Sequence, residues 1–379
     1  MEHSNFPEPR AAYIHVPFCA HRCGYCDFTL VARRDDLVGA YLDALELELA
    51  SLGEPRQIET LFLGGGTPTH LPADGLRRLL QLLKKWFRLQ PEYEFSCEAN
   101  PAGFTIEKME LLAEGGVNRI SLGAQSFDAA VLQTLERDHD ATQITDVINS
   151  LRPFCRNIGV DLIFGVPGQS LALWQETLQR AIQLSVQHVS TYGLTFEKGT
   201  AFWTRRSHGA LQSISEDLER EMYAAAMDKL PAAGFQQYEL SNFARPGFSC
   251  RHNGVYWAGD SYYGFGPGAA RYLAGRRETN HRSVTTWIKR VLARESPVGN
   301  AEELAPEDRA RELLVLGLRR AEGINRAQFR ARTGFEVELL AGERLAIYRR
   351  EQLVEDFGDW IRLTRAGRFV ADAIVVDCL

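Results

Sequence analysis

The stretch YIHVPFCAHRCGYCDF, residues 13–28, joins an apolar segment to a compact group of cysteines. Its first six residues, 13–18, have the aromatic and β-branched content of a strand. The following residues place Cys19, Cys23 and Cys26 at C-x₃-C-x₂-C spacing. A loop that directly follows a strand can wrap three thiolates around one small inorganic centre. Four ligands are usual for such a centre, so the source of the fourth ligand is an open question.

Beyond this stretch, β-rich runs alternate with helical patterns up to about residue 196. Such alternation predicts βαβ units and a parallel sheet. Six strands are too few for an eightfold barrel, so we expect a partial (β/α)₆ barrel or an open doubly wound sheet. The functional site should lie at the carboxyl ends of the strands. The strands are expected at 13–18, 60–66, 94–99, 119–126, 160–166 and 188–196, with helices over 35–53 and near 73–88, 105–115 and 171–185.

The pattern changes after residue 200. A helix is expected over about 215–233, followed by an aromatic stretch rich in turns, residues 237–257. From about residue 300 a helix, further short helices and a terminal β-like pair (358–364 and 368–377) indicate a smaller module. We therefore expect two domains, an α/β core with its extension over residues 1–298 and a mostly helical, winged-helix-like domain over residues 299–379.

The composition restricts the class of protein. The formal net charge of -6 argues against a surface dedicated to nucleic acid or anionic membranes. No stretch long enough to span a bilayer is free of charges, and MEHSNFPEPR lacks the layout of a signal peptide. A cytoplasmic protein without an integral membrane segment is expected. Because the cytoplasm keeps thiols reduced, the cysteine cluster is more typical of a metal site than of disulfides.

The residues alone leave the nature of the cysteine site open. A zinc site is one alternative, with His15 or His21 as the fourth ligand. No second C-x₂-C is present anywhere in the chain, although structural zinc sites usually pair ligands from two turns. An iron–sulfur cluster is the other alternative. Three cysteines that share a loop by chance are a third, less specific interpretation.

The spacing, with Tyr25 just before the third cysteine, resembles the motif of the radical S-adenosylmethionine (SAM) superfamily. The resemblance implies that Cys19, Cys23 and Cys26 hold a [4Fe–4S] cluster whose fourth iron is chelated by SAM. GGGTPT (64–69) resembles the segment that binds the SAM amino group. Residues that match SAM-contacting positions of the superfamily are Tyr13, Tyr25, Gly65, Gly66, Thr67, Glu98, Gln125, Arg137 and Asp161.

Over residues 13–370 the chain resembles the coproporphyrinogen-oxidase-like branch of the superfamily, through YIHVPFC, LFLGGGTPT, EANP, NRISLGAQSF, DLIFGVPGQS and RHNGVYW. One group in this branch is the anaerobic coproporphyrinogen III dehydrogenases. They carry a cysteine where this chain has Phe28, and a longer N-terminal extension. The other group is the HemW-type heme chaperones, which share the H-N-x-x-Y-W motif found at 252–257.

The second group is favoured, and it implies a protein that binds heme and transfers it to an acceptor protein. His252 is the candidate heme ligand, because imidazole can ligate heme iron and aromatic rings can pack on a macrocycle. A packed turn around a satisfied core histidine is the alternative for HNGVYW. The dehydrogenase stays as the alternative function. The expected cofactors are the [4Fe–4S] cluster, SAM and heme.

Overall fold

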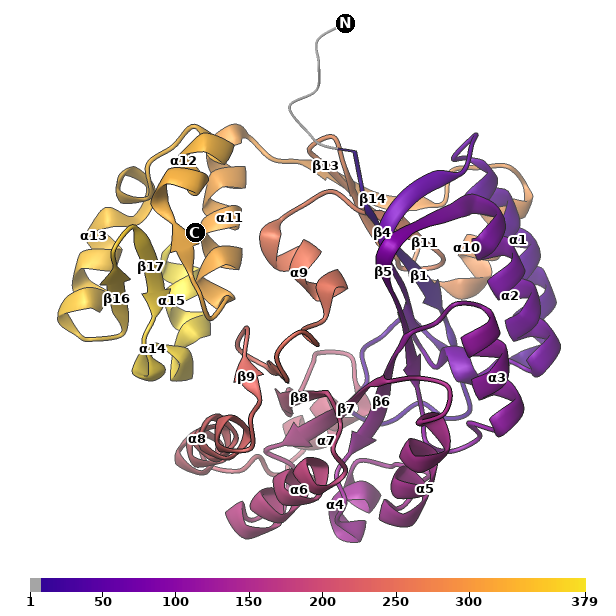
Figure 1. Ribbon diagram of the computed structural model, residues 1–379, viewed down its shortest axis with the longest axis horizontal. Helices are drawn as coiled ribbons and strands as arrows, with labels where there is room; N and C mark the ends of the chain where they lie inside the picture. Colours follow the sequence, from indigo (N-terminus) through magenta and orange to yellow (C-terminus); the bar gives the residue numbers. More distant parts are fainter. Residues whose placement is uncertain (1–7) are drawn as a thin grey trace, which may run out of the picture.

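The computed structural model describes residues 8–379, and a nine-stranded sheet dominates it (Figure 1). Six neighbouring strands of this sheet are parallel and follow the chain order, as predicted. They curve into the expected partial barrel and confirm the α/β class. These strands are β1 (Ala11–Val16), β4 (Arg56–Gly65), β5 (Phe87–Ala99), β6 (Arg119–Gln125), β7 (Asn157–Phe164) and β8 (His188–Gly193).

Three short strands that were not predicted extend the sheet at its edges. β11 (Tyr263–Phe265) pairs in parallel with β1, so a segment 250 residues away covers the first edge. β10 (Asn242–Ala244) is antiparallel to β8 and carries β9 (Gln236–Gln237). Strands of two or three residues have no measurable alternation of polar and apolar side chains, so no local pattern could predict them.

Helices pack on the outer face of the barrel (Figure 1). In α2, Leu76, Leu79, Leu80 and Leu83 recur at three- and four-residue steps and are buried. The predicted helix over 73–88 ends at Trp86, since β5 begins at Phe87. The outer helices are α1 (Val38–Ala50), α2 (Ala73–Trp86), α3 (Ile106–Glu114), α4 (Ala129–Thr134), α5 (Ala141–Leu151), α6 (Leu171–Gln183) and α8 (Glu216–Ala232).

Smaller elements complete the barrel half of the molecule. The loop after β1 contains β2 (Phe18–Cys19), which pairs with β3 (Val31–Ala32). The 3₁₀ helices Asp35–Leu37 and Pro68–His70 precede α1 and α2. Between β8 and α8 lies α7 (Ala201–Ser207). Strands β12 (Ala270–Leu273), β13 (Arg276–Asn280) and β14 (Val298–Glu303) form an antiparallel sheet. Helix α10 (Val284–Leu292) connects β13 to β14 and packs against α1.

The C-terminal part has a hydrophobic core of its own, to which Leu240 also belongs. Helices α11 (Pro306–Arg319), α12 (Arg326–Thr333) and α13 (Val337–Arg350) pack beside the sheet β15 (Ile324–Asn325), β17 (Trp360–Leu363) and β16 (Val354–Phe357). The domain limit expected at 298/299 falls at the first residue of β14, which pairs with β13.

Of the two segments predicted as a terminal β-like pair, the first is confirmed and the second is wrong. Residues 358–364 do contain β17, which pairs with β16. Residues 368–377 instead form the end of α14 (Arg365–Phe369) and α15 (Ala371–Asp377). Ala371, Ile374 and Val375 are buried at helical spacing, and this pattern outweighs the β-branched content of the segment. Within residues 8–379 no helix is both long and apolar enough to cross a bilayer.

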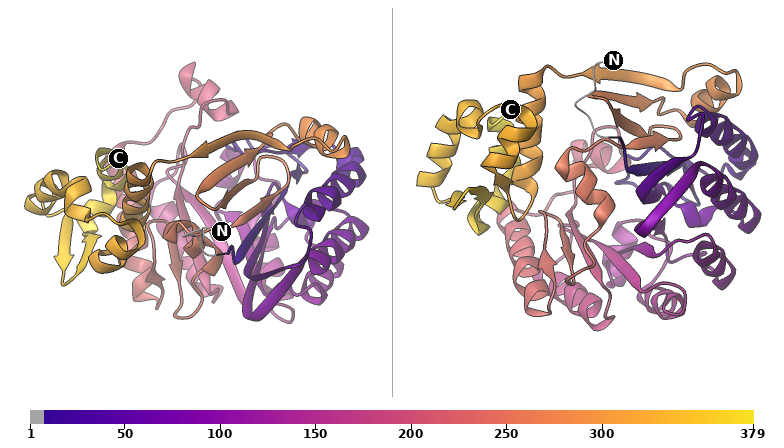
Figure 2. Two further views of the ribbon diagram at one scale, coloured as in Figure 1. Left: turned by 90° about the horizontal axis from the view of Figure 1, so that it is seen from above. Right: turned by 45° about the horizontal axis from the view of Figure 1, so that its top comes forward.

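One helix lies inside the curve of the sheet rather than outside it. This is α9 (Arg251–Ala258), and it occupies the space between the barrel strands and the C-terminal helices (Figures 1 and 2). The carboxylate of Glu94 on β5 accepts the backbone N–H groups of Arg251 (2.9 Å) and His252 (3.0 Å). An anion at a helix N-terminus satisfies unpaired N–H groups and interacts favourably with the helix dipole. The HNGVYW stretch, for which a packed turn was the alternative, is thus part of a capped helix.

His252 fastens α9 to the barrel. Its Nδ1 lies 2.9 Å from the hydroxyl of Thr60 on β4, and its Nε2 lies 2.8 Å from the hydroxyl of Tyr256. At the other end of α9, Arg319 of α11 packs over the Trp257 ring at 5.4 Å. The helix therefore joins the sheet to the C-terminal part.

The burial of His252 predicts a pH dependence of stability. Burial, with Arg119 nearby, lowers the pKa of His252 to about 3. The unfolded chain binds a proton at this residue below about pH 6.5, so the folded state loses stability as the pH falls from 6.5 toward 3. At pH 5.5 this loss is about 1.4 kcal/mol.

His252→Gln removes this titration and is expected to lower the free energy of unfolding at pH 7.5 by losing packing. The difference in the free energy of unfolding between the wild type and His252→Gln should then be about 1.4 kcal/mol smaller at pH 5.5 than at pH 7.5. Urea unfolding at both pH values measures it. A difference that stays constant with pH would contradict the neutral, buried state of His252.

Candidate functional site

The carboxyl ends of the barrel strands surround a cavity of about 510 Å³. Parallel strands place their carboxyl ends at one edge, so residues from distant parts of the chain meet there. Most of the predicted site residues line this cavity, and only Tyr13 and His252 do not. Those that do are Cys19, Cys23, Tyr25, Cys26, Gly65, Gly66, Thr67, Glu98, Gln125, Arg137 and Asp161.

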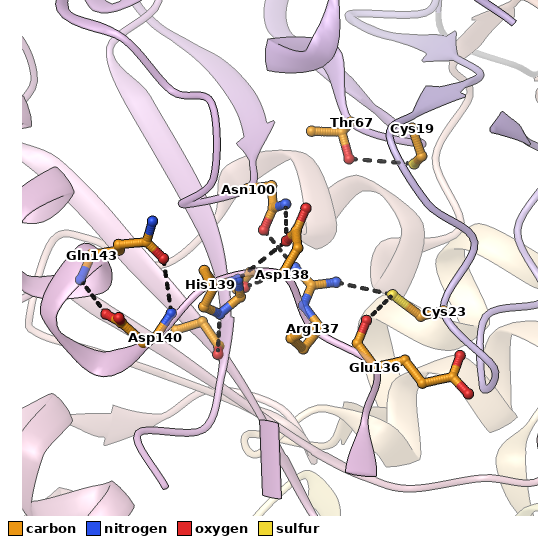
Figure 3. Close-up of polar contacts among 12 residues, drawn as sticks. Cys19, Cys23, Thr67, Asn100, Glu136, Arg137, Asp138, His139, Asp140 and Gln143 are labelled. Atoms are coloured by element: carbon orange, nitrogen blue, oxygen red, sulfur yellow. Dashed lines mark hydrogen bonds and ion pairs between the residues drawn. The ribbon is translucent and has the colours of Figure 1, made fainter. Parts of the chain in front are cut away.

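Cys19 is the last residue of β2, and Cys23 and Cys26 lie in the loop between β2 and β3. A hydrogen bond from Cys26 N–H to the Cys23 carbonyl (3.1 Å) closes a turn between the second and third thiols. The Cys19 Sγ lies 3.3 Å from the hydroxyl of Thr67, and Arg137 donates to the Cys23 Sγ at 3.4 Å (Figure 3). The thiols are thus held by residues that follow β4 and α4.

The electrostatics of the thiols fit a cationic centre. Burial raises the pKa of Cys19 to about 11 and also raises the pKa of Cys26. The thiols of Cys19 and Cys26 therefore stay protonated at neutral pH, and bound metal cations would displace those protons. Within the described residues, no three His, Cys, Asp or Glu side chains are arranged to hold a single metal ion. Three thiols around a cavity of this size fit a multi-iron cluster better than one ion.

The histidines considered as a fourth zinc ligand differ in position. His15 is buried, its Nε2 lies 2.6 Å from the Thr29 carbonyl, and burial lowers its pKa to about 4. It does not line the cavity. His21 does line it, with its Nε2 3.5 Å from the Glu136 carboxylate. Of these two histidines, His21 is therefore the one that lies in the cavity with the thiols.

The glycines of GGGTPT are required by packing against the strand that leads to the cysteines. Gly65 has a φ of +108°, and a Cβ there would lie 2.4 Å from the His15 ring. A Cβ on Gly66 would lie 2.7 Å from the carbonyl oxygen of Phe18. Gly66 and Thr67 donate backbone N–H groups to Val16 and Phe18. This segment thereby fixes the start of the cysteine loop, a role beyond the close approach to a ligand that the sequence suggested.

Two half-buried carboxylates line the cavity. Glu98 accepts the N–H of Gly65 at 3.0 Å, and Asp161 accepts hydroxyl hydrogen bonds from Ser121 (3.0 Å) and Ser190 (2.6 Å). Burial, with Asp161 nearby, raises the pKa of Glu98 to about 7. Burial also raises the pKa of Asp161. A pair of desolvated carboxylates favours a positively charged ligand between or beside them.

Arg137 brings a guanidinium to the same cavity. It donates to Asn100 Oδ1 at 2.6 Å and to the Gly123 carbonyl at 3.2 Å, in addition to the Cys23 Sγ (Figure 3). Its Nε is buried and has no hydrogen-bond partner within the described residues. The bonds made by the other two guanidinium nitrogens fix Arg137 at the cavity wall.

Of the remaining predicted SAM contacts, Gln125 and Tyr25 line the cavity, whereas Tyr13 does not. Gln125 ends β6 with a φ of +62°, in the left-handed region that few non-glycine residues adopt. Tyr25 packs edge-on against Phe202 with ring centroids 6.0 Å apart. Tyr13 stands behind the cavity wall, where its ring packs against Phe62 at 6.1 Å and its hydroxyl lies 3.1 Å from His15 Nδ1.

Sequence reasoning missed several residues of the cavity. Asn100 links Arg137 to Asp138, and Ser121 and Ser190 hold Asp161. Asn100 belongs to the EANP segment, so its position two residues after Glu98 was a usable signal. Serines in the middle of buried strands have no comparable signal, because only the pairing of β6, β7 and β8 brings them beside Asp161.

His252 is separated from the cavity. It is 1% exposed, and both ring nitrogens lie within hydrogen-bond distance of Thr60 and Tyr256. Its neighbour Asn253 is the residue of the H-N-x-x-Y-W motif that lines the cavity. Ligation of heme iron by His252 stays a prediction, and it requires at least one of these hydrogen bonds to break.

Comparison with known proteins agrees with this geometry. Residues 13–181 match the model of the radical SAM superfamily, and residues 304–370 match the HemN C-terminal domain. The chain is 34% identical to the heme chaperone HemW of Bacillus subtilis, over 96% of this chain and 98% of that protein. It is 35% identical to the heme chaperone HemW of Mycobacterium tuberculosis, over 97% and 94%.

The solved structure of coproporphyrinogen III oxidase (HemN) from Escherichia coli shares the fold. It superimposes with a TM-score of 0.87 at 22% identity, covering 99% of this chain and 91% of that one. Membership of the radical SAM superfamily implies a [4Fe–4S] cluster and SAM as cofactors. From these matches, the chain belongs to the radical SAM superfamily and, within it, to the family of the heme chaperones HemW.

Proposed function

We propose that the chain is a heme chaperone that binds a [4Fe–4S] cluster and SAM in the cavity, binds heme, and transfers it to an acceptor protein. One observation carries the cofactor part: three thiols and the polar residues at four strand ends line the same cavity. The family of the relatives supports the heme part. A cytoplasmic location and an unidentified acceptor belong to the same proposal.

In this proposal each residue has a defined task. Cys19, Cys23 and Cys26 would hold the cluster, which would supply electron transfer to bound SAM. Glu98 and Asp161 attract the positive charges of SAM, which carries an ammonium and a sulfonium group. Arg137 brings a positive charge to the cavity wall and keeps Cys23 in place. Gly65, Gly66, Thr67, Gln125 and Tyr25 shape the remaining wall, and Tyr13 supports it from behind.

The first prediction concerns the cluster. Anaerobic reconstitution of the wild type should yield about four irons and four sulfides per chain, since three cysteines and a ligand complete such a cluster. Cys19→Ala should lose most of both. Cys155→Ala is the matched control, because this cysteine is buried away from the cavity. About one zinc per chain without sulfide would contradict the cluster and favour the zinc alternative.

A second prediction concerns the charge of Glu98. Because its pKa is about 7, the carboxylate becomes neutral as the pH falls, and attraction for a cation weakens. Binding of SAM to the reconstituted wild type should be about tenfold weaker at pH 6 than at pH 8.

Isothermal titration calorimetry of wild type and Glu98→Gln at both pH values separates this effect from titration of SAM itself. The glutamine variant should bind more weakly at pH 8 and show a smaller change with pH. An equal pH dependence in the two proteins would remove Glu98 from the site.

A third prediction separates the two family functions. Titration with heme should give a saturable Soret band, whereas anaerobic incubation with SAM, reductant and coproporphyrinogen should give no protoporphyrinogen. Formation of protoporphyrinogen would establish the dehydrogenase alternative. If His252 ligates the iron, as the sequence predicts, His252→Ala should change the Soret spectrum and weaken binding. An unchanged titration would exclude His252 as a ligand.

A further inference from the structure

The loop that carries the three cysteines is also held by Glu136, which lines the same cavity. Glu136 follows α4, and one of its carboxylate oxygens, Oε2, accepts the backbone N–H of Gly24 at 2.8 Å. The same oxygen lies 3.5 Å from Nε2 of His21. The other oxygen, Oε1, accepts from Arg205 of α7 at 2.7 Å. One side chain therefore connects α7 to the loop between the first and third cysteines.

The backbone of Glu136 has a left-handed conformation, with a φ of +56°. A residue with a Cβ pays a steric cost there that glycine does not. This conformation follows from the end of α4, because Glu136 lies just past the C-cap and the N–H of Arg137 bonds back to the carbonyl of Leu132 at 2.9 Å. Glycine is therefore an unstrained substitution at this position, and loss of the carboxylate can be tested without added backbone strain.

Helix α7 also contacts the same loop directly. The N–H of Phe202 donates to the carbonyl of Gly24 at 2.8 Å, and the Phe202 side chain is fully buried. A Cβ on Gly24 would lie 2.4 Å from the Phe202 ring. The peptide groups on both sides of Gly24 are thus fixed, its N–H by Glu136 and its carbonyl by α7.

We propose that Glu136 is a positioning residue that clamps Gly24, together with Phe202 and Arg205 of α7, and so keeps the cysteine loop ready for the cluster. This inference rests on the proposed cluster site. Glu136 itself does not ligate the cluster in this proposal. It acts through the loop backbone, so its removal should affect how firmly the loop is held and how quickly a bound cluster loses iron.

The left-handed conformation of Glu136 provides a sharp experiment. Glu136→Gly removes the clamp and at the same time relieves the backbone, so the fold should not be destabilised much. Arg294→Gly is the matched control, since Arg294 has a φ of +60° and makes no side-chain hydrogen bond or ion pair within residues 8–379. Thermal unfolding of the variants without cofactors checks that both keep the wild-type fold.

Two measurements then test the clamp. Hydrogen exchange of the cofactor-free protein should show exchange at Gly24 at least about tenfold faster in Glu136→Gly, since a hydrogen bond to a carboxylate is lost. In the reconstituted protein, extraction of iron by a chelator should be about threefold to tenfold faster. Arg294→Gly should match the wild type in both, and Glu136→Gln, which keeps an acceptor oxygen, should lie between.

The outcomes are distinct from those that test the cofactor proposal. Unchanged exchange at Gly24 in Glu136→Gly would overturn the clamp, even if the cluster assembles normally. Faster exchange with unchanged iron extraction would overturn its role in holding the cluster. A wild type that takes up no iron would overturn the proposed cluster site and, with it, this function of Glu136.

A second pair of variants tests the contribution of α7. Arg205→Ala removes the ion pair with Glu136, whereas Arg206→Ala removes a neighbouring arginine that packs over Phe196 at 5.0 Å. The first should speed iron extraction by about twofold to threefold at low salt, and less at high salt, as expected for a partly exposed ion pair. The second should not. Equal effects of the two substitutions would exclude Arg205 from the clamp.

Discussion

The parallel alignment of six strands is the constraint on which the site depends. It brings the ends of β1, β4, β5, β6, β7 and β8 to one edge of the sheet, so each strand can contribute a polar residue without a long loop. Glu98, Gln125 and Asp161 lie near the carboxyl ends of three of these strands. Their side chains share a cavity because the pairing of the strands leaves them no other position.

This constraint explains why much of the site could be predicted from the sequence. Buried parallel strands give apolar runs between helical patterns, and these runs located all six strands. Five were placed within four residues of their observed limits, whereas β5 begins at Phe87 rather than at 94. Cys19 and Glu98 directly follow or end such runs, so their convergence could be inferred without coordinates. The resemblance to a known superfamily then assigned tasks to residues whose positions the pattern had already brought together.

The remaining features depend on contacts between segments that are distant in the sequence. The strands β9 to β11 have two or three residues each and are defined only by their partners. Helix α9 lacks an apolar stripe because it has polar partners on the inside of the barrel, such as Glu94 and Thr60. The role of Glu136 was not predicted, since its contact with Gly24, 112 residues away, has no local signal.

The contacts of the H-N-x-x-Y-W motif indicate a structural role, the attachment of α9 to its neighbours. His252 bonds to Thr60 of the sheet, Tyr256 lies beside the same imidazole, and Trp257 packs under Arg319 of the C-terminal part. A charge on His252 would have to be accommodated in a site where Arg119 is already nearby, so the buried imidazole is neutral and depends on its two hydrogen bonds. Ligation of heme iron by this residue would therefore compete with the attachment of α9 to the barrel. Heme binding through His252 would then be coupled to the contact between α9 and the C-terminal helices.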